Sequence, residues 1–121
     1  MWRVPTRETV VVSRPTNSDL NRLFAASLEF GENWRRPIPD LAATYLTHLS
    51  KDEQAAVSDV IERCRHDVEA QIEKVHLEAV GAWSKSAVLE VERWITDRFP
   101  WMSAGNRRHA ISQGQYYAWH G

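Results

Sequence analysis

Acidic and histidine side chains recur at helical spacing in the middle of this chain. Successive members lie three or four positions apart, so on a helix they all point to one side. The six residues are Asp59, Glu62, His66, Glu69, Glu73 and His76. Side chains of these types at this spacing can bind a metal ion, bind a basic partner, or face water as a solvated helix surface.

The metal interpretation requires more ligands than the sequence supplies. Glu73 and His76 have the Glu-x-x-His spacing of di-iron helical bundles. Such a site also needs a second pair of this kind and two further carboxylates on facing helices. The next predicted helix offers Glu90 and Glu92 without a histidine. We therefore expect no metal and no cofactor, and the six residues form either a solvated face with internal ion pairs or a surface that binds another protein.

The aromatic C-terminal third provides a second candidate surface. Each large ring carries about 150–250 Å² of mostly apolar surface, so it either joins the core or docks on another molecule. One side of a terminal helix presents His109, Gln113, Tyr116 and, on the adjacent stripe, Trp119. Tyr and Trp are frequent in interface hot spots, which favours a binding surface. The alternative is that Tyr117 and Trp119 clamp the last helix onto the bundle, with their polar tips in water.

The sequence shows no clear motif for covalent catalysis or for cofactor binding. Cys64 lies among apolar residues at helical spacing, where a thiol is buried and inert. Ser103 is better explained as a helix cap than as a nucleophile, and the five glycines form no phosphate-binding loop. An enzyme or ligand-binding bundle is the third-ranked alternative. Its pocket is expected among Trp83, Trp94, His109 and Tyr116.

Hydrophobic periodicity predicts an all-α fold, a compact bundle of four to five helices around one long central helix. Apolar residues form a seam along that helix: Val57, Ile61, Cys64, Val68, Ile72, Val75 and Ala79. Ser50 and Glu53 have the spacing of a capping box at its start. The helices are expected from Asn17 or Ser18 to a stop at Gly31, from 38 or 39 to Leu49, from 51 to 80, from 84 or 86 to Arg98, and from a cap at Ser103 onward.

Residues 1–16 differ in character from the rest of the chain. Residues 8–13 are rich in β-branched side chains and are bounded by Pro5 and Pro15. Such a run forms an extended arm that lies over the helices, or a short strand that pairs with a second copy or a partner.

Length and charge narrow the class of protein. The 121 residues fit one helical domain, 1–121, and the net charge of −1 argues against a nucleic-acid binder. Residues 39–98 carry seven basic against twelve acidic side chains, so the middle of the chain is acidic. No membrane span and no secretory signal is expected, and cytoplasmic is the expected location.

These observations favour a small helical protein-interaction module, an inhibitor or adaptor of the immunity-protein kind. The expected partner is another protein with a basic surface, because an acidic stripe speeds association with such a surface. A homo-oligomeric structural domain is the second interpretation, and a small ligand- or metal-binding enzyme is the third.

Overall fold

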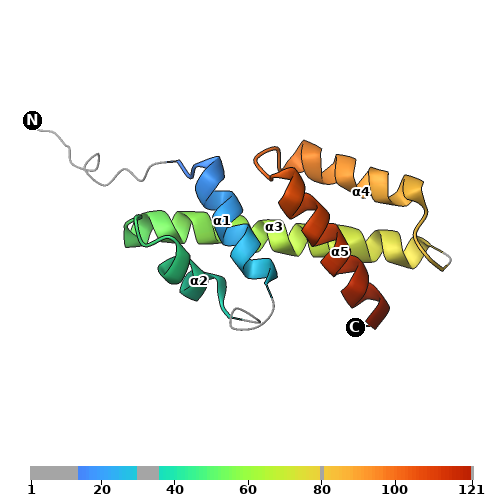
Figure 1. Cartoon of the computed structure of the whole chain (residues 1–121), viewed down its shortest axis with the longest axis horizontal. Coiled ribbons are helices and arrows are strands. Elements are labelled where there is room, and N and C mark those ends of the chain that lie inside the picture. Colours follow the sequence, from blue (N-terminus) through green and yellow to red (C-terminus); the bar gives the residue numbers. More distant parts are fainter. Residues whose placement is uncertain (1–13, 30–35, 80, 121) are drawn as a thin grey trace, which may run out of the picture.

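Five α-helices make up the regular structure in the computed structural model of the chain (Figure 1). The structure describes residues 14–29, 36–79 and 81–120. The helices are α1 (Asn17–Leu28), α2 (Ile38–Tyr45), α3 (Lys51–Glu78), α4 (Lys85–Arg98) and α5 (Ala104–His120). No strand occurs within these residues, so the predicted all-α fold is confirmed.

Two predictions for the N-terminal part fall outside the described residues. Residues 1–13 are not described, and 14–16 are coil that leads into α1, so the choice between an arm and a strand stays a prediction. The helix stop predicted at Gly31 also lies in an undescribed range, 30–35. α1 itself ends earlier, with Glu29 as its C-cap.

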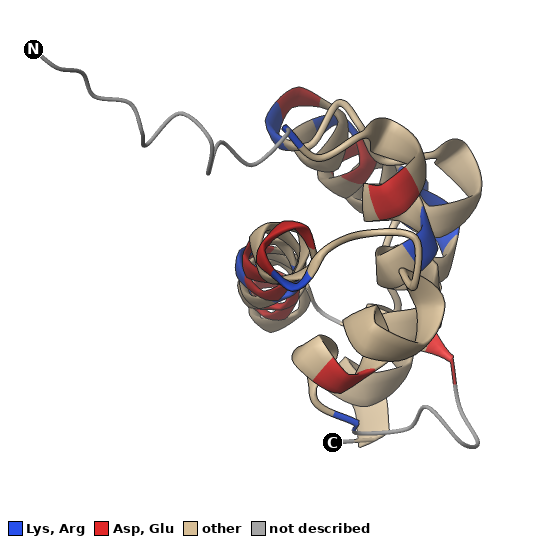
Figure 2. Cartoon of the chain, turned by 90° about the vertical axis from the view of Figure 1, so that its left-hand side faces the viewer, with Lys and Arg blue, Asp and Glu red and all other residues tan. Residues whose placement is uncertain are grey.

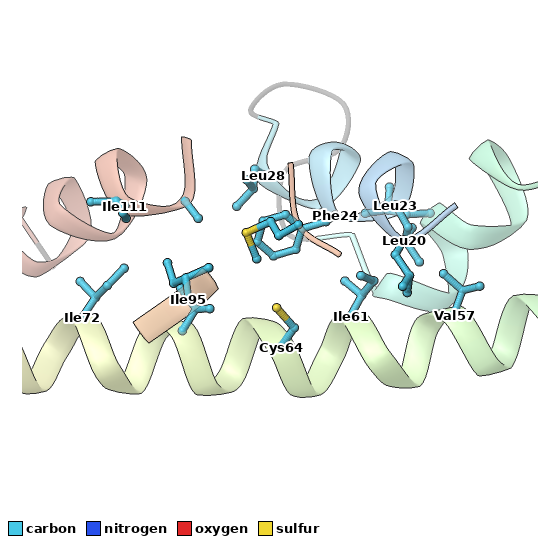
Figure 3. Packing of buried hydrophobic residues seen from close by; sticks show 14 of the residues in the cluster. Leu20, Leu23, Phe24, Leu28, Val57, Ile61, Cys64, Ile72, Ile95 and Ile111 are labelled. Atoms are coloured by element: carbon cyan, nitrogen blue, oxygen red, sulfur yellow. The ribbon is translucent and has the colours of Figure 1, made fainter. Parts of the chain in front are cut away.

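The long helix α3 is the element that every other helix contacts. It runs along the molecule, and α1, α2, α4 and α5 cover one side of it (Figure 1, Figure 2). The covered side carries the predicted seam, whose six members within α3 are buried: Val57, Ile61, Cys64, Val68, Ile72 and Val75. Figure 3 shows Val57, Ile61, Cys64 and Ile72 directed toward the helices that cover α3. An amphipathic helix packed in this way leaves its charged side in water, as the end-on view in Figure 2 shows.

Cys64 is a core residue, as its position in the seam predicts. Its side chain is fully buried and forms no disulfide. Burial, with a smaller contribution from the Asp67 carboxylate, raises the pKa of the thiol to about 12. A thiol in this environment stays protonated at neutral pH and acts as a small apolar group.

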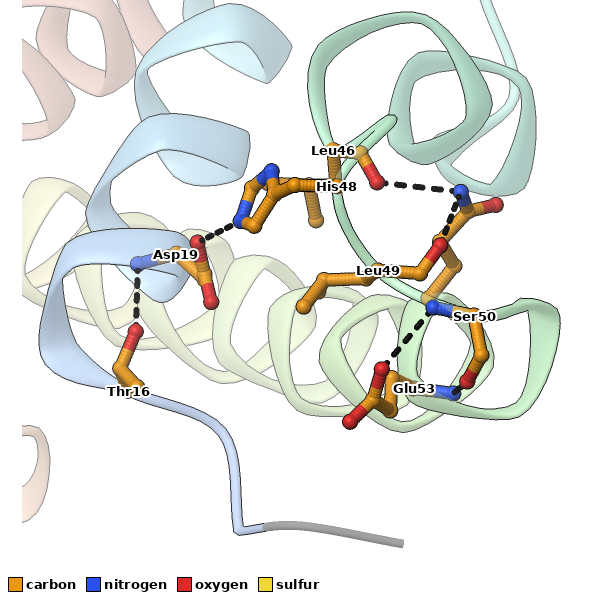
Figure 4. A network of polar contacts seen from close by, with 8 residues as sticks. Thr16, Asp19, Leu46, His48, Leu49, Ser50 and Glu53 are labelled. Atoms are coloured by element: carbon orange, nitrogen blue, oxygen red, sulfur yellow. Dashed lines mark hydrogen bonds and ion pairs between the residues drawn. The ribbon is translucent and has the colours of Figure 1, made fainter.

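The predicted continuation of the second helix to Leu49 is wrong. α2 ends at Tyr45, and the chain turns toward α3 through Leu46, which is fully buried, and Leu49. The amide of Gln54 donates to the carbonyl oxygens of Leu46 (3.1 Å) and Leu49 (3.2 Å), as Figure 4 shows. Because a side chain satisfies these carbonyls, the two leucines reach the core from a turn and do not need a helix.

The turn is also tied to the start of α1. His48 Nε2 lies 2.8 Å from Asp19 Oδ1 (Figure 4). Asp19 is buried, and its backbone N–H donates to the side chain of Thr16, the N-cap of α1. Thr16 therefore caps the helix one residue before the predicted start.

A reciprocal capping box starts α3, as the spacing of Ser50 and Glu53 predicts. The backbone N–H of Glu53 donates to Ser50 Oγ (3.1 Å), and the backbone N–H of Ser50 donates to Glu53 Oε1 (2.9 Å) (Figure 4). Ser50→Ala is expected to lower the free energy of unfolding by about 1 kcal/mol, since it leaves the Glu53 N–H without its cap. Urea denaturation measures this loss. Ser112→Ala, at an exposed position inside α5, is the matched control and is expected to change stability by less than about 0.5 kcal/mol.

The remaining helix boundaries also follow from local capping. α3 ends at Glu78, and Gly81 takes a positive φ of 86° in the turn that follows. Ser84 accepts a hydrogen bond from the backbone of Ala87 at the start of α4, and Ser103 does the same for α5. None of the helices in the described part of the chain is long and apolar enough to cross a membrane.

Candidate functional site

A groove of about 690 Å³ lies among α1, α3 and α5. Its floor is apolar and takes side chains from all three helices: Phe24 and Leu28 from α1, Val68 and Ile72 from α3, and Ala110 and Gly114 from α5. Its wall on the α3 side is polar and consists of Arg65, His66, Glu69, Glu73 and His76. The groove therefore joins part of the predicted acidic stripe to the predicted C-terminal helix.

The floor of the groove depends on a close approach of two helices. Gly114 of α5 faces Ile72 of α3, and a Cβ atom at Gly114 would lie only 2.5 Å from Ile72 Cδ1. Glycine is the one residue that permits this spacing without displacing Ile72. The two helices thus meet at Gly114, and the groove opens along their flank.

Gln113 differs from the expectation for a surface residue. It is only 8% exposed, and its amide donates to the carbonyl oxygen of Leu28 at the end of α1. That carbonyl belongs to the last turn of a helix and has no partner within the helix. Gln113 lines the groove and joins α5 to α1, so it holds two of the groove walls together.

The α3 stripe is exposed along most of its length. Asp59, Glu62, His66, Glu69 and Glu73 are exposed, and His76 is half-buried. His66, Glu69, Glu73 and His76 line the groove. Glu62 lines a second depression of about 290 Å³, which shares Arg65, His66 and Glu69 with the groove and extends it toward Ile38. Asp59 lines neither depression and lies beyond them on the same side.

The charge of this wall is negative. Arg65 is its one arginine or lysine, and its guanidinium donates to Glu69 Oε2 (2.8 Å) and to the carbonyl oxygen of Ser27 (2.6 Å). Arg65 is therefore occupied by contacts within the protein. Among the described residues, Glu62 and Glu73 take part in none of the ion pairs. Both carboxylates are free to meet a cationic group from outside.

The open end of the groove is apolar and aromatic. Leu77 lines the groove and is 77% exposed, and Trp119, which contacts the groove-lining His76, is 55% exposed. The Trp119 ring meets the His76 ring at its edge, with centroids 5.4 Å apart. The indole N–H of Trp83 donates to His76 Nδ1 (3.4 Å). His76 therefore holds two tryptophans at the point where α3, α5 and the turn before α4 meet.

The aromatic third of the chain is divided between core and surface. Trp94, Phe99 and Trp101 form a chain of edge-to-face contacts that ends on the buried ring of Phe24. Tyr116, by contrast, is 54% exposed, and its ring contacts the rings of Tyr117 and His120 in α5, with the His120 centroid 4.5 Å away. His109 is exposed as well. Part of the aromatic third therefore packs against the core, and part of it is exposed.

The groove is not the pocket that the third interpretation expects. None of Trp83, Trp94, His109 and Tyr116 lines the groove. Trp94 instead packs under the guanidinium of Arg98 at 5.2 Å, on α4.

The groove combines apolar contact area with acidic side chains. Within residues 14–29, 36–79 and 81–120, no three His, Cys, Asp or Glu side chains come together in a geometry that could hold a metal ion. The apolar floor and acidic wall can instead bury apolar groups and pair with cations.

Comparison with protein-family models, with curated proteins and with solved structures finds no match to this chain.

Proposed function

We propose that this chain is a protein-interaction module, an adaptor or inhibitor that binds a partner protein with a basic surface. Its binding surface is the acidic face of α3, defined as Asp59, Glu62, Glu69 and Glu73. The observation that carries the proposal is that all four carboxylates are exposed on one side of the helix. An exposed field of one sign steers an oppositely charged partner and sets the orientation in which it docks.

The contrast with α4 supports this assignment. α3 holds eight acidic against four basic side chains, whereas α4 holds three of each. Charged residues that only keep a helix solvated can be balanced in sign, as they are on α4. The excess of acidic residues on α3 therefore indicates a further role for that helix. Three of the acidic residues of α3, Glu62, Glu69 and Glu73, line the groove or the depression that extends it, so charge and apolar contact area are available at one place.

Affinity capture with charge-reversed baits tests the proposal. The Glu62→Lys/Glu73→Lys variant reverses two exposed carboxylates of the acidic face. We expect it to bind the partner at least about tenfold more weakly than the natural chain, because attraction becomes repulsion at both positions. Glu90→Lys/Asp97→Lys changes the net charge equally at two exposed positions of α4 and is expected to bind normally. The measurements are mass spectrometry of the captured proteins and the dissociation constant of the recovered complex.

Salt dependence provides an independent check. Binding that depends on the acidic face is expected to weaken as ionic strength rises from about 50 to 300 mM, since the Debye length shortens over this range. Equal capture by both double variants, or no specific partner at low salt, would contradict the proposal. Sedimentation velocity addresses the second interpretation, because a homo-oligomeric structural domain has to sediment as more than one chain.

A further inference from the structure

We infer, building on the proposed function, that the groove among α1, α3 and α5 receives one amphipathic helix of the partner protein, with lysine or arginine beside its apolar stripe. The proposed function requires only that the acidic face attracts a basic surface. The inference adds the kind of element that docks, the place where it docks and the arrangement of its side chains.

The dimensions of the groove suit a helix. The main groove and the smaller depression share Arg65, His66 and Glu69, so together they follow α3 from Glu62 to Leu77. The fifteen steps along the helix from Glu62 to Leu77 correspond to about 22 Å. A partner helix of about four turns has the same length, and its apolar residues at i, i+3, i+4 and i+7 then lie over the floor.

Charge differs between the walls, and this difference orients the occupant. The α1 and α5 residues that line the groove carry no formal charge: Phe24, Leu28, Ala110, Gln113, Gly114, Tyr117 and Ala118. The α3 side carries Glu62, Glu69 and Glu73, of which only Glu69 is paired with Arg65. A helix with its apolar stripe on the floor therefore needs its basic residues on the flank that faces α3, and an acidic flank there meets repulsion.

The openness of the groove argues for a macromolecular occupant. A small-molecule site usually encloses most of its ligand. Here His66, Glu69, Glu73 and Leu77 line the groove and are all exposed, so one long side of an occupant stays in water. A helix that is part of a larger partner protein can bind the groove with one side while its other side remains outside the groove. Leu77, which lines the groove and is exposed, offers apolar contact area to such a helix.

Designed peptides test the inference without knowledge of the partner. The first peptide has about 16 residues, with leucine at helical spacing and lysine on one flank. The second carries glutamate in place of lysine, and the third has the composition of the first in an order that forms no apolar stripe. Fluorescence anisotropy of the labelled peptides measures each dissociation constant. We expect the first peptide to bind at least about tenfold more tightly than either of the others.

Two matched pairs of variants locate the bound peptide. Ala118→Trp fills the groove from α5, whereas Ala55→Trp adds the same ring at an exposed position of α3 outside it. Glu73→Lys reverses a carboxylate of the wall, and Glu90→Lys reverses one on α4. We expect Ala118→Trp to weaken binding of the first peptide about tenfold and Glu73→Lys about fivefold, with both controls unchanged. Circular dichroism establishes that each variant is folded.

The outcomes separate this inference from the proposed function. If the scrambled basic peptide binds as well as the first, and Ala118→Trp has no effect while Glu73→Lys weakens both, the acidic face binds cations but the groove does not take a helix. That result overturns the inference and leaves the proposed function standing. If the glutamate peptide binds equally well, the charge argument is wrong. If the chain self-associates and the first peptide cannot compete with self-association, the occupant is a second copy and the inference is overturned.

Discussion

Asn21→Ala is expected to lower the free energy of unfolding by about 2–4 kcal/mol, because one side chain joins α1 to the segment that connects α4 and α5. Asn21 Nδ2 donates to the carbonyl oxygen of Trp101 (2.7 Å), and Oδ1 accepts from the backbone N–H of Ser103 (2.8 Å). The amide of Asn106 also donates to Oδ1 (3.0 Å). Alanine leaves the partly buried carbonyl of Trp101 and the N–H of Ser103 without this partner, and Asn106 keeps only its bond to the backbone carbonyl oxygen of Asn21. Urea denaturation monitored by circular dichroism measures the loss.

Two further variants show whether the amide itself is responsible. Asn17→Ala removes an exposed asparagine one turn earlier in α1 and is expected to cost less than about 0.5 kcal/mol. Asn21→Asp keeps the acceptor for Ser103 but cannot donate to Trp101, so its stability should fall between those of the natural chain and Asn21→Ala. Equal stability of the two alanine variants would contradict this role of Asn21.

Local signals in the sequence predict most of the helix boundaries and the buried face of α3. A capping box or a capping serine acts within three residues, so Ser50, Ser84 and Ser103 could be identified without any knowledge of the fold. The seam from Val57 to Val75 could be identified because helical periodicity alone decides which side chains share a face. α2 is the exception, since Leu46 and Leu49 keep helical spacing while the chain has already turned.

The long-range polar contacts could not be predicted from the sequence. Asn21 and Asn106 are 85 positions apart, and so are Gln113 and Leu28. Nothing in the residues around Gln113 distinguishes it from a solvent-exposed glutamine, because its partner is a backbone carbonyl that any residue could supply. A glutamine of this kind can be recognised as buried only when the end of α1 is in place beside it.

Only part of the groove could be predicted from the sequence, because the rest depends on contacts between residues far apart in the chain. The stripe that forms its polar wall follows from spacing, but its floor requires α1 and α5 to meet over α3. Two signals pointed to it. Leu77 is an apolar residue outside the seam of α3, and Gly114 is a glycine inside a predicted helix. The first marks an exposed contact surface, and the second marks a place where another helix comes close.

Gly114→Val is expected to destabilise the protein by about 2–4 kcal/mol, because its side chain enters space that Ile72 already fills. A Cβ at Gly114 lies 2.5 Å from Ile72 Cδ1 and 3.1 Å from Ile72 Cγ2. Ile72 is buried, and its Cβ lies 3.5 Å from the same point, so a rotation that moves Cδ1 alone does not relieve the contact with Cγ2 and Cβ. Thermal and urea denaturation measure the loss. Gly105→Val, at the other end of α5, meets no atom within 4 Å and is expected to change stability by less than about 0.5 kcal/mol.

A double-mutant cycle with Ile72→Ala identifies the cause. Ile72→Ala alone is expected to cost about 2–5 kcal/mol, because it leaves a cavity between the helices. The valine at position 114 then finds room in that cavity, so the double variant should be more stable than the sum of the single losses by at least about 1 kcal/mol. Additive losses would show that Gly114 matters for another reason than its contact with Ile72. A favourable coupling would establish that the closest approach of α3 and α5, and with it the floor of the groove, is set by the absence of a side chain at Gly114.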